Sequence, residues 1–426
     1  METHRLPGLV VRPHIFRLPL DPEQPDGRQI EIFAREMRAA AHADEERPYL
    51  VFLQGGPGFG SPRPESNSGW FKKATERYHI LLLDQRGTAN STPITARGLA
   101  AIGDAEAQAE YLSHFRMDRI VDDCEAIRAQ LCPGKRWAIL GQSFGGFCAT
   151  HYLSFHNEGL SEVYITGGLP PLDASAEQIY QRTFAELERK NAAYFARYPG
   201  DQARLDQLAD YLDANDVMLP GGDRFTSRRL QALGLGLGMS DGFEAIHHLL
   251  EMPFVEGPDG PEPSYPFLRA IEHALHFDTH PIYALLHEGC YTQGEASNWA
   301  AARVLEELPH FAAESRPLLM SGEMVYPWQF DEFSELRAMR EAAQLIAIKE
   351  DWPQLYDRAA LAANTVPVAA AVYANDLYVD REYSLDTADA IGNCKVWMTS
   401  EYEHNGLRAD GPTVLGHLMD LVHGER

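Results

Sequence analysis

The segment Gly141 to Gly146 combines small residues with a potential nucleophile. It reads Gly-Gln-Ser-Phe-Gly-Gly, follows an apolar strand-like segment at 137–140 and precedes an apolar helical stretch at 147–153. A serine at a sharp strand-to-helix turn stands above the sheet, where its hydroxyl can attack a carbonyl carbon. Gly-x-Ser-x-Gly also occurs by chance as a glycine-rich helix start, but this setting gives the motif a mechanical meaning. The sequence therefore predicts Ser143 as a nucleophile.

A serine nucleophile needs hydrogen-bond donors for the oxyanion that develops, and two backbone N–H groups are candidates. Phe144 follows the serine near the N-terminal end of the predicted helix, where backbone N–H groups have no partner inside the helix. Gly56 lies in the turn Gln-Gly-Gly-Pro-Gly at 54–58, directly after a strand-like segment at 49–53. Two glycines allow the backbone to approach a ligand closely. The alternative for this segment is a plain tight turn.

The base and the acid that complete such a site are expected just beyond later strands. Asp376 follows a strand-like segment at 366–373, His404 follows one at 395–399, and a crossover helix at 387–391 fits between them. Ser, Asp, His is the chain order that accompanies this serine turn. In this interpretation His404 takes the proton of Ser143 and Asp376 orients the imidazole. The rival residues lie further from the strand ends or on the last helix: Asp380, Asp386, His417 and His423.

The segment Asp84-Gln85-Arg86-Gly87 follows another strand-like segment at 78–83. Asp84 precedes the serine, so it has the wrong chain order for the catalytic acid. We therefore expect a structural role, in which Asp84 and Arg86 pair and shape the loop beside the site.

The elements that must position these residues form an α/β pattern. Short apolar segments alternate with helical ones over the first 170 residues, which is typical of a sheet with helices on its faces. From about 175 to 360 helical periodicity dominates, broken by a Pro/Gly-rich loop at 256–266. The sequence thus predicts an α/β core, residues 1–172 and 363–426, split by a helical insertion, residues 173–362. The remaining predicted elements are strands at 30–35 and 163–166 and helices at 118–131 and 413–422.

Composition narrows the classes of partner. The 426 residues include 62 acidic and 37 basic side chains, a formal charge of −25. Such a field repels nucleic-acid phosphates and anionic lipid surfaces. The apolar runs are far shorter than the roughly 20 residues of a membrane-spanning helix, and no secretory signal pattern begins the sequence. Five scattered cysteines without a Cys-x-x-Cys pair predict reduced thiols, so we expect a cytoplasmic protein.

Taken together, the motifs resemble those of the prolyl aminopeptidases (proline iminopeptidases) of the α/β-hydrolase fold. That family carries His-Gly-Gly-Pro-Gly, Asp-Gln-Arg-Gly, Gly-x-Ser-x-Gly-Gly and a late Asp and His. The corresponding segments here are 54–58, 84–87, 141–146, Asp376 and His404, and the resemblance covers nearly the whole chain. One departure is Gln54, where the family usually has histidine. This position orients the loop and is no triad member, so the change bears on substrate subclass more than on hydrolysis.

The resemblance implies that the helical insertion is a cap that closes over the serine and binds a free N-terminus. Carboxylates of such a cap would hold the substrate ammonium group. By resemblance Glu288, in the segment Leu-His-Glu-Gly-Cys-Tyr at 286–291, is the first candidate. Glu323, in Gly-Glu-Met-Val-Tyr at 322–326, is the second and has no firm motif match. The alternative for each is a solvated or structurally paired acid.

Three further features of the sequence could suggest a metal, a dinucleotide or a second nucleophile, but we expect none of these. His273, His276 and His280 have near-helical spacing, but no acid or cysteine completes a metal-ligand set, so histidines of an amphipathic helix are expected. The Gly-x-Gly-x-Gly run at 234–238 has no preceding strand, which argues against dinucleotide binding. Cys148, five residues past the serine, is expected in the core.

The sequence thus predicts a serine exopeptidase that releases an N-terminal residue, preferably proline, through an acyl-enzyme. Its partners would be peptides with a free N-terminus, with no cofactor, metal, nucleic acid or membrane. An aminopeptidase or an amide or ester hydrolase of different specificity is the nearest alternative. A catalytically silent binding module is the alternative from another class. No oligomeric state follows from the sequence.

Overall fold

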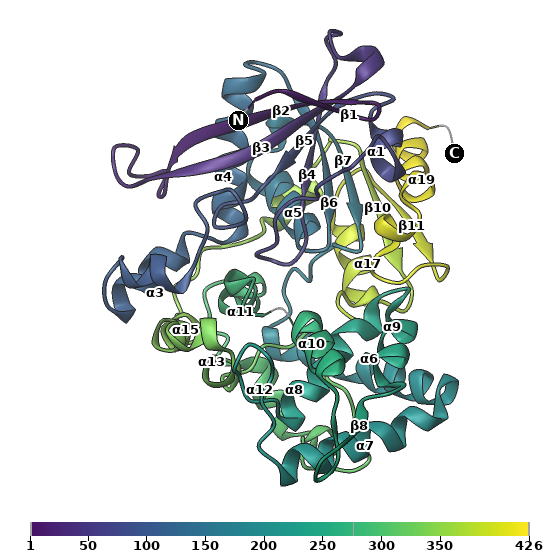
Figure 1. Cartoon of the computed structure of the whole chain (residues 1–426). Coiled ribbons are helices and arrows are strands. Elements are labelled where there is room, and N and C mark those ends of the chain that lie inside the picture. The colour runs from purple at the N-terminus through teal and green to yellow at the C-terminus, as the bar shows by residue number, and fades with distance from the viewer. Residues whose placement is uncertain (1, 276, 425–426) are drawn as a thin grey trace.

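The computed structural model describes residues 2–275 and 277–424. Its centre is a sheet of nine strands, drawn in the upper half of Figure 1, with most of the helical insertion below it. The strand order is β1-β2-β3-β5-β4-β6-β7-β10-β11. The strands span β1 His4–Leu6, β2 Leu9–Pro19, β3 Gln29–Ala39, β4 Tyr49–Leu53, β5 His79–Leu83, β6 Trp137–Gln142, β7 Leu160–Thr166, β10 Val368–Tyr373 and β11 Cys394–Thr399.

The direction of the strands decides where the predicted chemistry lies. The sheet has a parallel part with the strand order β5-β4-β6-β7-β10-β11. The remaining neighbours, β1 with β2, β2 with β3 and β3 with β5, pair antiparallel. Parallel strands end at one edge of the sheet, so the segments that follow β4, β6, β10 and β11 share that edge. The sequence did not predict β1 and β2, because charged residues and prolines interrupt the apolar pattern of β2.

Alternation of side chains along the strands divides the core into two layers. Leu50 and Phe52 of β4 face one layer, and Val51 and Leu53 face the other. The first layer contains side chains of α1 and α19, and the second those of α4, α5 and α17. The prediction of an α/β fold with helices on both faces is confirmed. These helices span α1 Gly69–Ala74, α4 Met117–Leu131, α5 Phe144–Phe155, α17 Arg381–Ala390 and α19 Gly411–His423.

Between β7 and β10 the chain is mainly helical. The predicted loop at 256–266 instead contains a hairpin of β8 (Phe254–Gly257) and β9 (Gly260–Pro263), because the Asp-Gly pair and the positive φ of Gly260 supply a tight turn. The helices there are α6 Ala176–Arg197, α7 Pro199–Ala214, α8 Ser227–Gln231, α9 Gly242–Leu250, α10 Tyr265–Ala274, α11 Pro281–Leu286, α12 Ala300–Glu306, α13 Gln329–Glu332, α14 Ser334–Arg337, α15 Arg340–Ala347 and α16 Arg358–Ala362. Elsewhere lie α2 Ala96–Ala100, α3 Ala105–Ser113 and α18 Gly406–Ala409.

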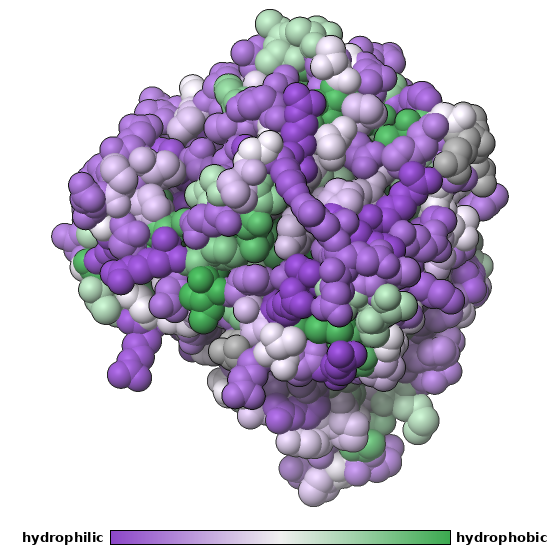
Figure 2. All heavy atoms as spheres, turned by 90° about the horizontal axis from the view of Figure 1, so that it is seen from above, coloured by the Kyte–Doolittle hydropathy of each residue, from purple (hydrophilic) through white to green (hydrophobic). Residues whose placement is uncertain are grey.

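The molecular surface carries mainly polar side chains. Figure 2 shows a face that is mostly hydrophilic, with small hydrophobic patches between the polar groups. Among the described residues we find no helix with the length and apolar character needed to cross a membrane. The five cysteines are free thiols, and Cys148 is fully buried, as predicted.

Candidate active site

Ser143 occupies the sharp turn between β6 and α5. Its backbone has φ +54° and ψ −126°, a conformation that non-glycine residues rarely adopt. The turn fits only because Gly145 lacks a side chain, since a Cβ atom there would lie 1.9 Å from the carbonyl oxygen of Leu53. The small residues of the motif therefore allow the helix to start directly against β4, with the serine at its first turn.

His404 and Asp376, which follow β11 and β10, are in direct contact. The imidazole Nδ1 lies 3.0 Å and 2.8 Å from the two carboxylate oxygens of Asp376. Asp376 also accepts hydrogen bonds from the backbone N–H groups of Tyr378 and Val379. Because Asp376 fixes Nδ1 as the protonated nitrogen, Nε2 is left as the base of the neutral ring.

The surroundings of His404 favour its charged form. Burial alone would lower the pKa of His404, but the charge and hydrogen bond of Asp376, aided by the charge of Glu323, raise that pKa above its ordinary value. An imidazolium that forms during proton transfer is therefore stabilised where it arises.

The rival acids and histidines have other partners. Asp380 caps α17 by accepting hydrogen bonds from the N–H groups of Glu382 and Tyr383. His417 stacks on Trp397, with ring centroids 4.2 Å apart. Neither residue lines the cavity that contains Ser143.

The two residues predicted to supply oxyanion donors, Phe144 and Gly56, belong to the segments beside the serine. Phe144 is the first residue of α5, so its N–H has no carbonyl partner within the helix. Gly56 lines the same cavity as Ser143. The adjacent Gly55 must be glycine, because a Cβ atom there would lie 2.8 Å from Cβ of Ser143. The side chain of Gln85 anchors this loop by donating to the carbonyl oxygen of Gln54 at 3.1 Å.

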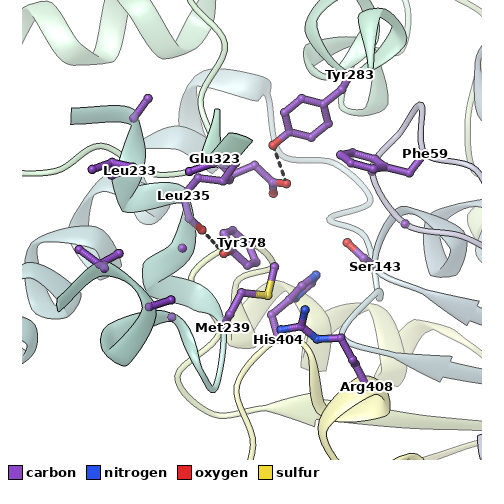
Figure 3. A pocket seen from close by; sticks show the side chains of 18 of the residues that line it. Phe59, Ser143, Leu233, Leu235, Met239, Tyr283, Glu323, Tyr378, His404 and Arg408 are labelled. Atoms are coloured by element: carbon purple, nitrogen blue, oxygen red, sulfur yellow. Dashed lines mark hydrogen bonds between the residues drawn. The ribbon is translucent and has the colours of Figure 1, made fainter. Parts of the chain in front are cut away.

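A cavity of about 500 Å³ lies between the sheet edge and the helical insertion. Ser143, His404 and Glu323 face it together in Figure 3. Most other lining side chains are apolar, among them those of Leu233, Leu235 and Met239. The cavity thus combines a nucleophile, a base and a carboxylate with an apolar wall, as small-ligand sites commonly do.

Glu323 presents its carboxylate to this cavity. The hydroxyl of Tyr283 donates a hydrogen bond of 2.9 Å to its Oε1. Burial raises the pKa of Glu323 to about 7, although the charge of His404 and the Tyr283 hydrogen bond act in the opposite direction. At neutral pH the carboxyl therefore exchanges readily between its acid and anionic forms, and a cation beside it would favour the anion.

Glu288 lies elsewhere. Its two oxygens accept hydrogen bonds of 3.1 Å and 3.0 Å from the N–H groups of Ala300 and Ala301, at the start of α12. Glu288 is absent from the lining of the Ser143 cavity. The structure therefore brings Glu323, but not Glu288, to the serine, and it gives Glu288 a helix-capping contact.

The predicted pairing of Asp84 with Arg86 is wrong. Asp84 binds the Oγ of Ser61 at 2.7 Å and the guanidinium of Arg63 at 3.0 Å. Arg86 instead forms a buried bidentate pair with Asp123, at 2.8 Å for both contacts. The side chain of Arg86 is directed toward Asp123 on α4, whereas that of Asp84 is directed toward Ser61 and Arg63. Each residue therefore links a separate segment to the end of β5.

The Gly-x-Gly-x-Gly run at 234–238 contributes to the site in a way that sequence analysis missed. It lies in a 3₁₀ helix, Ala232–Gly238, that lines the cavity. The carbonyl of Gly238 accepts a hydrogen bond of 3.2 Å from the N–H of His404. A Cβ atom on Gly238 would lie 2.4 Å from the ring of Tyr378. Repeated glycines in a helical context were the available signal for such close packing.

Of the histidines with near-helical spacing, His273 and His280 lie among the described residues. His276 lies outside the described residues. Within the described ranges, no group of three or more His, Cys, Asp or Glu side chains could hold a metal ion.

The mostly parallel sheet, the serine turn after β6 and the His–Asp pair beyond later strands define an α/β hydrolase. Residues 48–214 match the family model of the α/β-hydrolase fold. A bromoperoxidase structure from Bacillus anthracis aligns with a TM-score of 0.41 at 14% identity, covering 96% of this chain and 100% of that one.

Two similar proteins identify the family to which the chain belongs within the α/β hydrolases. The chain is 48% identical to a proline iminopeptidase from Aeromonas sobria, over 98% of its own length and 97% of the relative's. It is 35% identical to a proline iminopeptidase from Aspergillus aculeatus, over 95% of its own length and 92% of the relative's. The chain therefore belongs to the proline iminopeptidase, or prolyl aminopeptidase, family of α/β hydrolases, as the sequence motifs predicted.

Proposed function

We propose that this protein hydrolyses the bond after an N-terminal proline, using Ser143, His404 and Asp376 as a catalytic triad. Its family membership makes it a hydrolase of the aminopeptidase type. The observation that carries the mechanism is the buried contact of His404 with Asp376, beside the cavity that Ser143 and Glu323 also line.

Acylation begins when Oγ of Ser143 attacks the carbonyl carbon of proline while Nε2 of His404 takes its proton. The oxyanion accepts hydrogen bonds from the N–H groups of Gly56 and Phe144. The carbon–nitrogen bond then breaks, and His404 gives its proton to the leaving amine. Water next transfers a proton to His404 and attacks the ester carbon; the bond to Oγ of Ser143 then breaks, His404 returns the proton to Oγ, and proline is released.

Requirement for a free N-terminus follows from Glu323. Among the described residues that line the cavity, Glu323 is the only carboxylate. An N-terminal ammonium can pair with the Glu323 carboxylate, whereas an internal peptide segment would bring no cation to it. The apolar wall of Leu233 and Leu235 is suited to the hydrocarbon ring of proline.

The proposal is tested by hydrolysis of prolyl, alanyl and N-acetylprolyl amides together with short acyl esters. We expect the prolyl amide to have the highest kcat/KM, the acetylated form to be inert, and Ser143→Ala to abolish turnover. Equal rates on prolyl and alanyl amides would indicate a different N-terminal specificity. A protein that turns over no substrate and does not react at Ser143 with a serine-directed phosphonate would be a binding module.

A further inference from the structure

A second cavity, of about 470 Å³, adjoins the first beside His404. Both cavities are lined by Gln54, Gln142, Met239, His404 and Arg408. Because these residues form the boundary, the two spaces meet beside the imidazole. Ser143 and Glu323 line only the first cavity.

The proposed reaction determines how a substrate lies across the two cavities. The proline must lie in the first cavity, with its amine at Glu323 and its carbonyl carbon at Ser143. His404 delivers a proton to the leaving nitrogen, so that nitrogen must lie on the His404 side of the carbonyl. The chain that continues from it is therefore directed toward the second cavity.

The second cavity is apolar on one side. Phe52, Trp70 and Phe71 line it, with ring centroids 4.9 Å apart for the first pair and 4.0 Å for the second. Leu407 adds a further apolar side chain. No carboxylate is among its described lining residues.

Arg408 supplies the positive charge at the boundary, and Figure 3 shows it beside His404. Its Nη2 donates to Oδ1 of Asp241 at 2.6 Å, and the two side chains are 64% and 71% exposed. An exposed ion pair contributes little to stability, so the guanidinium can exchange this partner for a substrate carboxylate at small cost. A guanidinium can bind such a carboxylate through two parallel hydrogen bonds.

We infer that the second cavity is the subsite for the residue after the scissile bond, and that its preferred occupant is an apolar or aromatic residue with a free carboxylate held by Arg408. The substrate class is accordingly dipeptides of proline followed by an apolar residue. This inference rests on the proposed function, which supplies the direction of the substrate.

The first test compares kcat/KM for Pro-Phe, Pro-Gly and prolinamide, whose leaving group is ammonia. Burial of a phenylalanine side chain corresponds to roughly a tenfold or larger preference for Pro-Phe over Pro-Gly. Phe71→Ala should reduce this preference by lowering kcat/KM for Pro-Phe, whereas Arg97→Gln, a change at an exposed residue that lines neither cavity, should leave the preference unchanged. Equal values for Pro-Phe and Pro-Gly, with prolinamide still hydrolysed, would overturn the subsite but not the proposed function. Failure to hydrolyse any of the three compounds would refute the proposed function instead.

The second test compares Pro-Phe with its C-terminal amide. The wild type should prefer the free acid about tenfold through KM, and Arg408→Gln should remove this preference. Arg97→Gln is the matched control, because Arg97 is exposed and lines neither cavity. An unchanged acid-to-amide ratio in Arg408→Gln would overturn the role of Arg408.

Discussion

At the scale of single residues, the contact between His404 and Asp376 determines which imidazole nitrogen can act as the base. Both side chains are buried, so water cannot replace Asp376 as the partner of Nδ1. Glu323 acts on the same imidazole from across the cavity and favours its protonated form. Asp376 thus fixes the tautomer of the imidazole, and in the proposed mechanism Glu323 links the charge of His404 to that of the substrate amine.

Asp376→Asn should lower kcat/KM by about 10⁴-fold, because the amide can donate to Nδ1 and so favours the wrong tautomer. Steady-state kinetics on a prolyl amide measures the loss. The matched control is Asp380→Asn, since asparagine also caps helices well and Asp380 caps α17. A comparable loss in both variants would contradict the assignment of Asp376 as the triad acid.

Glu323→Gln should change the acid side of the pH profile. Glu323 is protonated below its pKa of about 7 and cannot then pair with the ammonium. The pKa of His404 is also raised, so the wild type must lose two protons for activity. We expect the limiting slope of log kcat/KM against pH to approach 2 in the wild type and 1 in Glu323→Gln, with KM increased. Identical profiles and KM values would show that Glu323 does not bind the amine.

At the scale of elements, glycines and buried polar groups determine how closely the segments approach the site. Gly145 brings α5 against β4, and Gly238 brings the helical insertion against Tyr378. Glu288 holds the start of α12. Such contacts make the helical insertion a wall of the cavity, although none of these residues takes part in proton transfer.

Glu288→Ala should lower the free energy of unfolding by about 1–2 kcal/mol, because two N–H groups of α12 lose their acceptor. Urea unfolding measures this change, and KM for prolyl amides should stay within twofold. Glu288→Gln keeps one acceptor oxygen and should lose less stability. A large increase in KM with unchanged stability would instead support Glu288 as a ligand of the substrate amine.

At the scale of the whole molecule, Arg116 links the α/β core to the helical insertion. It lies just before α4, is 1% exposed, and stacks over Trp352 with its guanidinium carbon 4.6 Å from the ring centroid. Its guanidinium donates to the carbonyl oxygens of Gly289, Thr292 and Pro353. One side chain thereby joins three backbone sites of the insertion to the core.

Arg116→Met should lower the free energy of unfolding by about 3 kcal/mol or more, since each buried carbonyl left without a donor costs about 1–3 kcal/mol. Urea unfolding followed by fluorescence measures the loss. The half-buried Arg119, whose charged partners are Asp21, Glu23 and Asp122, provides the control Arg119→Met, which should cost under about 1 kcal/mol. Equal effects of the two substitutions would contradict a linking role for Arg116.

The local sequence pattern was sufficient to predict the α/β fold class, the strand ends that carry the candidate site residues, and the protein family. Strand periodicity and turn glycines are properties of neighbouring residues, so the segments at Ser143, Asp376 and His404 were predictable, as was family membership from motif identity. The antiparallel strands β1 and β2 were missed because interrupted apolar patterns carry a weak signal. The β8–β9 hairpin was misread as a loop because its Pro/Gly-rich sequence resembles one.

The tertiary structure determines which charged side chains are in contact. Asp84 and Arg86 are only two residues apart, but the chain turns after β5 and their side chains are directed to different partners, Arg63 and Asp123. Glu323 reaches the cavity and Glu288 reaches α12, although both lie in the helical insertion and both were candidates. Spacing along a chain does not fix distances across a fold, where packing of the insertion on the sheet edge selects the carboxylate that faces the serine.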